Sequence, residues 1–198
     1  LLQRQFTAKE QALIVLNSLF WERSDPLQIP AELALDLPRA QRSTDWHGNT
    51  LLLLDGVRIP SGGVAILTKD ELSQSDVPPS ACRATALADA GFLLQNDFYD
   101  LYLNANGDIS RLYDKRVQRD VLPPGQLGNE LVAYEDRPLD FDAWDIDLFY
   151  EEKPYRLGDT VSLRILEEGP VRATIESVCY YLSSRITQRT SLRRSSPR

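Results

Sequence analysis

Short runs of alternating or β-branched residues, separated by Gly, Pro, Asn and Ser turns, dominate this chain of 198 residues. The clearest example is a pair of runs at residues 98–103 and 109–113, which flank Asn104-Ala105-Asn106-Gly107. Asn-Gly supplies the positive φ angles of a tight antiparallel hairpin, so the two runs are predicted to pair. Turn signals recur at intervals of roughly 8–12 residues, without long helical periodicity. The pattern predicts an all-β fold, an antiparallel β-sandwich.

The other runs extend this prediction along the chain. Residues 51–54 and 56–59 are expected to form a hairpin around Asp55-Gly56. Ser73 to Ser80 (SQSDVPPS) is predicted to be a linker between a small β subdomain at 12–72 and the start of a large β-sandwich domain at 81–198, which is expected to be truncated at the C-terminus. Residues 1–11 are assigned to the end of a preceding helical region or a linker. Further strands are predicted at residues 12–20, 27–37, 64–68, 82–88, 130–134, 161–166, 171–181 and 185–192.

Composition excludes several kinds of partner. The net charge of −7 argues against binding to nucleic acid or to an anionic membrane, because phosphate binding requires a basic surface. No apolar run is long enough to span a bilayer. Cys82 and Cys179 are predicted to be buried thiols in a reducing compartment, the cytoplasm, and His47 a turn residue. The absence of methionine indicates a piece of a longer protein.

Residues 136–150 (DRPLDFDAWDIDLFY), called here the acidic aromatic segment, carry the most chemistry. Aspartates accept hydrogen bonds from sugar hydroxyls, and aromatic faces pack against the C–H face of a pyranose. The plainer reading is an acidic surface loop held by buried aromatics. Asp142, Asp145 and Asp147 could also supply the carboxylate pair of a glycosidase or ligands for calcium, although the spacing lacks the Gly and Glu of an EF-hand loop. The arginines of the last segment are expected on an exposed strand face or against a missing partner.

Seven blocks of sequence resemble the α-mannosidases of glycoside hydrolase family 38. The match runs from about residue 13 to the end of the chain. Two departures from the family pattern fall at framework positions. Ser18 stands where the family has Pro, and Asp97-Phe98-Tyr99-Asp100 stands where the family often has Arg-Val. The blocks are LNSLFWER (16–23), LQNDF (94–98), GDISRLYDK (107–115), RDVL (119–122), GNEL (128–131), EDRPLDFDAWDIDLFYEE (135–152) and SRITQRTSL (184–192).

The resemblance implies the β-sandwich portion of a retaining α-mannosidase, including the start of a sandwich like that of galactose mutarotase. In this family an N-terminal barrel, followed by a three-helix bundle, carries the catalytic zinc, its ligands and the nucleophile. This chain is therefore expected to hold no catalytic residue and no metal ligand, and to act through the absent barrel on mannose-containing oligosaccharides. The resemblance makes five residues candidates for contact with the substrate or its neighbours: Asp136, Arg137, Asp142, Trp144 and Asp145.

Two other functions remain open from the sequence. One is a free-standing carbohydrate-binding module, and the other is a structural sandwich that mediates assembly, for example into a homo-oligomer. An ion pair between Arg137 and one of the aspartates would make the acidic aromatic segment a structural clasp instead of a sugar contact. If a partner domain is missing, aromatics of the second half should be exposed.

Overall fold

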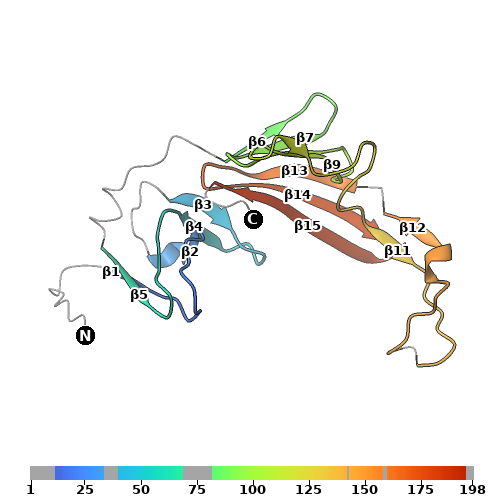
Figure 1. Ribbon diagram of the computed structural model, residues 1–198, viewed down its shortest axis with the longest axis horizontal. Coiled ribbons are helices and arrows are strands. Elements are labelled where there is room, and N and C mark those ends of the chain that lie inside the picture. Colours follow the sequence, from blue (N-terminus) through green and yellow to red (C-terminus); the bar gives the residue numbers. More distant parts are fainter. Residues whose placement is uncertain (1–11, 34–39, 69–81, 142, 158–159, 195–198) are drawn as a thin grey trace.

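The computed structural model describes residues 12–33, 40–68, 82–141, 143–157 and 160–194. Within them the fold is built from antiparallel strands, which confirms the predicted all-β class (Figure 1). The strands are β1 (Ala12–Leu16), β2 (Leu27–Pro30), β3 (Gln41–Thr44), β4 (Thr50–Leu54), β5 (Val64–Thr68), β6 (Arg83–Ala86), β7 (Phe92–Gln95), β8 (Tyr99–Leu103), β9 (Ile109–Asp114), β10 (Arg119–Asp120), β11 (Val132–Tyr134), β12 (Pro154–Arg156), β13 (Thr160–Glu168), β14 (Arg172–Tyr181) and β15 (Ser184–Arg193); the short 3-10 helices are η1 (Ala31–Leu33) and η2 (Tyr150–Glu152).

The sandwich, as the term is used below, consists of two sheets packed face to face. One sheet has the order β10-β9-β8-β7-β6 and the other has the order β13-β14-β15 (Figure 1). The inner faces contribute apolar side chains to one core because alternate residues of a strand point the same way. The buried members of this core are Cys82, Ala84, Leu94, Leu101, Leu103, Ala173, Ile175 and Leu192.

The predicted hairpin between β8 and β9 is confirmed. The side chain of Asn104 accepts hydrogen bonds from the backbone N–H groups of Asn106 and Asp108, at 2.9 and 3.0 Å. Gly107 has φ 86°, and a Cβ atom there would lie 3.1 Å from the Cβ of Ser177. Glycine is therefore required both by the turn and by the close approach of β14.

The small unit, residues 12–68, forms a separate core. The pair β1-β5 packs against the sheet β2-β4-β3, and Ile29, Leu54, Val57 and Ile59 are its buried apolar residues. The predicted hairpin of residues 51–54 and 56–59 is wrong: β4 pairs with β2 and β3, and Ile59 bridges to Arg23. β3 and β4 form a hairpin across the turn at residues 45–49, whereas the β2–β4 pairing and the Arg23–Ile59 bridge join segments farther apart in sequence.

Other predictions for the first half need correction. The strand predicted at residues 12–20 ends at Leu16, and its apolar residues Ile14 and Leu16 are mostly exposed. The strand predicted at 27–37 ends at Pro30 and continues as the 3-10 helix η1. Residues 1–11 and the linker at 73–80 lie outside the described residues, so the domain boundary remains a prediction.

The small unit meets the sandwich through a set of buried polar contacts, called here the polar junction. It comprises Gln41, Ser43 and Asp55 from the small unit and Glu167, Arg172 and Arg194 from the sandwich. The side-chain oxygen of Gln41 accepts from the N–H groups of Val171 and Arg172 at 2.7 and 2.9 Å, and its amide donates to the carbonyl of Arg172 at 2.7 Å.

Charged groups complete the polar junction. Arg172 donates to Glu167 at 2.6 and 2.7 Å and to the hydroxyl of Ser43 at 2.9 Å, while Ser43 itself donates to Glu167. Arg194, buried to 8% exposure, pairs with Asp55 at 3.0 Å. The expectation that the late arginines face solvent or a missing partner is thus wrong for Arg194, because the small unit covers it.

The predictions for the two cysteines and for His47 are confirmed. Cys82 and Cys179 are free and buried, and burial raises the pKa of the Cys82 thiol to about 11. His47 lies in the turn between β3 and β4, where Asp45 accepts hydrogen bonds from the backbone of His47 and Asn49. None of the helices in the described ranges is long and apolar enough to cross a membrane.

Candidate functional site

The acidic aromatic segment leaves the sandwich at β11 and returns through η2 to β12 (Figure 1). Its base is held by the pairing of β11 with β12 and by an edge-to-face contact between Tyr134 and Tyr150, whose ring centroids are 5.2 Å apart. Glu135 accepts a hydrogen bond from Lys153 at 2.5 Å and also pairs with Arg137. The Lys153 hydrogen bond, with the charge of Arg137, lowers the pKa of Glu135. The base is therefore defined by specific contacts.

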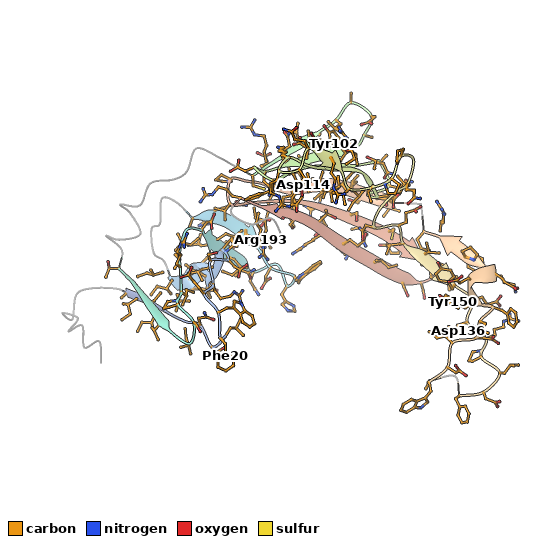
Figure 2. The ribbon with its side chains drawn as sticks, in the orientation of Figure 1. Phe20, Tyr102, Asp114, Asp136, Tyr150 and Arg193 are labelled. Carbon is orange, nitrogen blue, oxygen red and sulfur yellow. The ribbon has the colours of Figure 1, made fainter. Side chains whose placement is uncertain are left out.

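The tip of the segment projects away from the sandwich and is almost uncovered (Figure 2). Backbone hydrogen bonds from the N–H groups of Trp144 and Asp145 to the carbonyl of Phe141 form a turn there. The large apolar side chains of this region are mostly exposed, which agrees with the expectation of exposed aromatics: Leu139 91%, Phe141 74%, Trp144 92%, Ile146 65%, Leu148 89% and Phe149 66%. Apolar side chains gathered on a protruding turn are typical of a surface that contacts another body.

The five predicted contact residues all belong to the acidic aromatic segment. Asp136, Arg137, Trp144 and Asp145 are exposed, and Asp142 lies outside the described residues. Arg137 pairs with Glu135, and the Arg137 side chain is 80% exposed; among the described residues of the segment, Arg137 has no recorded ion pair with an aspartate. The idea that buried aromatics pin this loop is likewise wrong for Phe141, Trp144 and Phe149.

A hollow of about 170 Å³ lies at the base of the segment. Of the four predicted contact residues that the structure describes, it includes Arg137 alone. Glu135, Glu152 and Lys153 also line it, together with Asp147, Phe149 and Tyr150. Sequence reasoning missed Glu135 and Lys153 because β12 was not predicted: their pairing follows from the register of Tyr134 with Pro154.

The described residues contain no group of three or more His, Cys, Asp or Glu side chains placed to hold a metal ion. The calcium reading of Asp145 and Asp147 therefore gains no support within that part of the chain. Nor does that part of the chain offer a donor set that fits the zinc implied by the resemblance.

The blocks that carry the family resemblance serve as framework. Asn96, in LQNDF, accepts from the N–H groups of Phe98 and Tyr99 and donates to the carbonyl of Arg193 at 2.8 Å. Lys115, in GDISRLYDK, donates to the carbonyl of Asn96 at 2.8 Å. Asn17, in LNSLFWER, is 4% exposed and donates to three backbone carbonyls of the small unit. These polar side chains replace missing backbone partners in turns.

These features define an antiparallel β-sandwich domain with a projecting acidic aromatic segment. Residues 94–198 match the family model of the glycosyl hydrolases family 38 C-terminal domain. The chain belongs to this family.

Curated relatives agree with the family match. The chain is 31% identical over 140 residues to alpha-mannosidase G of Dictyostelium discoideum, covering 67% of this chain and 12% of the relative. It is 26% identical over 165 residues to alpha-mannosidase 2C1 of Mus musculus and to that of Homo sapiens, covering 83% of this chain and 14% of each relative. The match thus spans only a small part of the relatives' own length.

Proposed function

We propose that this chain is the non-catalytic β-sandwich portion of a retaining α-mannosidase that hydrolyses terminal α-mannosidic linkages in glycans. In this proposal the acidic aromatic segment packs on an N-terminal catalytic barrel and helps to wall its sugar pocket. Asp136, Arg137, Asp142, Trp144 and Asp145 would contact the substrate or the residues around it.

One observation carries the proposal: a member of this family holds an aromatic segment rigidly at its base and leaves its tip uncovered. Trp144 is 92% exposed, whereas Glu135 at the base is fixed by Lys153 and Arg137. Covering a large apolar side chain with a partner surface lowers the free energy of the complex, which favours association. The names of the curated relatives support mannosidic glycans as the substrate class.

The zinc of the parent enzyme would be held by residues outside this chain, since the described residues offer no fitting cluster. When bound, such a metal orients sugar hydroxyls. The contribution of this chain is to exclude water and to position the sugar through side chains of the acidic aromatic segment. A cytoplasmic location is part of the proposal, supported by the free thiols of Cys82 and Cys179.

The test is to replace Trp144 by Ala in the longer α-mannosidase that the proposal requires. Burial of a tryptophan at an interface is commonly worth at least about 2 kcal/mol, so kcat/KM for an α-mannoside should fall by roughly tenfold or more. Leu182→Ala is the matched control, because Leu182 is 87% exposed in the turn between β14 and β15 and lies outside the acidic aromatic segment. Equal activity of both variants would contradict the proposal.

A free-standing carbohydrate-binding module is the second candidate, because exposed Trp144 beside carboxylates also suits glycan stacking. Isothermal titration of the 198-residue chain with mannose and manno-oligosaccharides separates the two functions. The module requires micromolar binding that Trp144→Ala abolishes. The accessory role requires no such binding by this chain on its own. Light scattering of the same sample tests the third reading, assembly into a homo-oligomer.

A further inference from the structure

An open cleft of about 530 Å³ lies where the small unit meets the end of β15. Its volume falls in the range of small-molecule sites, which often lie between domains. The small unit supplies Arg23 and Asp25, and the sandwich supplies Arg193, which Figure 2 labels between the two parts. The apolar wall includes Leu16, Pro26 and Leu27. Neither the acidic aromatic segment nor the polar junction contributes a residue to this cleft.

The charged groups of the cleft leave a positive excess. Arg23 donates to one oxygen of Asp25 at 2.5 Å, and Arg193 donates to the other oxygen at 3.3 Å. Among the described residues that line the cleft, Asp25 is the single carboxylate, so there two guanidinium groups share one negative charge. The chain as a whole has a net charge of −7, which disfavours the approach of anions, so this local excess of positive charge distinguishes the cleft.

Both arginines keep donors that face the cleft. Each guanidinium has five N–H groups, and the structure records one hydrogen bond from each to Asp25. Their side chains are 41% and 40% exposed, so the remaining donors are open to a ligand.

The backbone around these arginines is fixed before any ligand arrives. Arg23 exchanges two backbone hydrogen bonds with Ile59, at 2.9 and 2.8 Å. Arg193 is paired within the sheet, and its carbonyl accepts from the amide of Asn96. Such preorganisation reduces the entropy lost on binding.

We infer that this cleft binds a small ligand that carries an oxyanion, a phosphate or a carboxylate, on a body of monosaccharide size. The oxyanion lies between Arg23 and Arg193, where paired donors suit its geometry. The body of the ligand lies against Leu16, Pro26 and Leu27. The inference does not depend on the proposed function, because it uses none of the residues assigned there.

The experiment titrates the 198-residue chain with glucose 6-phosphate, glucuronate and neutral glucose, and follows backbone amide shifts by NMR. We expect a dissociation constant on the order of 1 mM for an anionic sugar, weakened by added NaCl. Binding of the phosphate or the uronate alone would identify which oxyanion the site takes. Equal binding of neutral glucose would overturn the inference.

Three variants locate the site. Arg23→Ala and Arg193→Ala should each weaken binding by about tenfold or more, because each removes charge-assisted hydrogen bonds. Arg58→Ala is the matched control: Arg58 is exposed, pairs with Glu22 at 3.4 Å and does not line the cleft. It should bind as the unchanged chain does.

Asp25→Asn distinguishes a ligand site from a purely structural ion triad. Removal of the internal carboxylate should tighten anion binding several-fold, because Asp25 competes with the ligand for the same guanidinium groups. A triad that serves only to join the two parts would lose stability with Asp25→Asn or Arg193→Ala and bind none of the probes. That result would overturn the inference.

Discussion

The two faces of strand β14 are buried by different chemistry. On one face Ala173 and Ile175 enter the apolar core of the sandwich, with exposed fractions of 0% and 1%. On the other face Arg172, Thr174 and Glu176 engage in hydrogen bonds and ion pairs. Because alternate residues of a strand point to opposite sides, one ten-residue strand serves both interfaces.

The two interfaces should differ in how much stability a single substitution removes. Apolar contacts are non-directional, so loss of a buried methyl group costs its transfer free energy and the small cavity that it leaves, but exposes no unpaired polar group. The polar junction is directional, and Glu167 has partners on three sides: Arg172, Ser43 and Thr174. Removal of one partner leaves a buried charge without compensation. The polar face should therefore be the more sensitive to single changes.

The largest effect is expected from Arg172→Met. The change removes both hydrogen bonds to Glu167 while keeping a long apolar side chain at the site. We expect the free energy of unfolding to fall by about 3–5 kcal/mol, measured by urea denaturation, because a buried carboxylate loses its counter-charge.

The double variant Glu167→Gln/Arg172→Met is the control for that prediction. It removes the buried charge as well as its partner, so part of the lost stability should return. A cost below about 1 kcal/mol for Arg172→Met alone would mean that solvent screens the pair, and the contrast between the two faces would fail.

Acid should weaken the polar face selectively. Burial by itself would raise the pKa of Glu167, but hydrogen bonds from Arg172, Ser43 and Thr174 outweigh it and lower the pKa below the ordinary 4.5. The ionised carboxylate therefore stabilises the fold above that value, and the stabilisation is lost as pH falls through the lower pKa of the folded state. Urea midpoints measured from pH 7 down to roughly pH 3 should decline less steeply for Glu167→Gln than for the unchanged chain. Parallel curves would contradict this assignment.

Neighbouring residues on opposite faces give a smaller and more direct comparison. Thr174→Val keeps the volume but removes a hydroxyl that donates to Glu167, at an expected cost of about 1–3 kcal/mol. Ile175→Val removes one methyl group from the apolar core, at an expected cost of about 0.5–1.5 kcal/mol. Urea unfolding of both variants measures the two costs. If Ile175→Val proves the costlier, the apolar face is the more sensitive one.

Local chemistry made much of the sandwich predictable from the sequence. The hairpin at Asn104 and Gly107 contains its own turn signals, and the alternation within residues 161–192 gives the last three strands. By contrast, the pairing of β4 with β2 and the bridge of Ile59 to Arg23 depend on contacts between more distant segments. The polar junction could not be foreseen, because Gln41 and Arg172 are 131 positions apart and each resembles an ordinary surface residue in the sequence.

The candidate site was predictable in place but not in detail. The aspartates and aromatics of the acidic aromatic segment identified it as unusual, and the structure leaves the tip uncovered. The contact between Glu135 and Lys153 at its base could not be predicted without the short strand β12. The sequence of that strand, Pro154-Tyr155-Arg156, has no alternation of apolar and polar residues that would indicate a strand. Whether the five predicted residues contact a sugar stays a prediction.

The smallest effect on stability is expected from Trp144→Ala. Trp144 is 92% exposed, and its side chain lies outside both apolar cores, so the free energy of unfolding of this chain should change by less than about 0.5 kcal/mol. Urea unfolding provides the measurement, with Leu182→Ala as the matched exposed control. An exposed tryptophan that does not stabilise its own domain is typical of a contact surface. The same substitution is therefore expected to lower activity or binding only where a partner covers the ring. A loss above about 1 kcal/mol in this chain would mean that the tip packs on its own sandwich. The segment would then be a buried part of this chain, as both faces of β14 are, and not a contact surface for a partner.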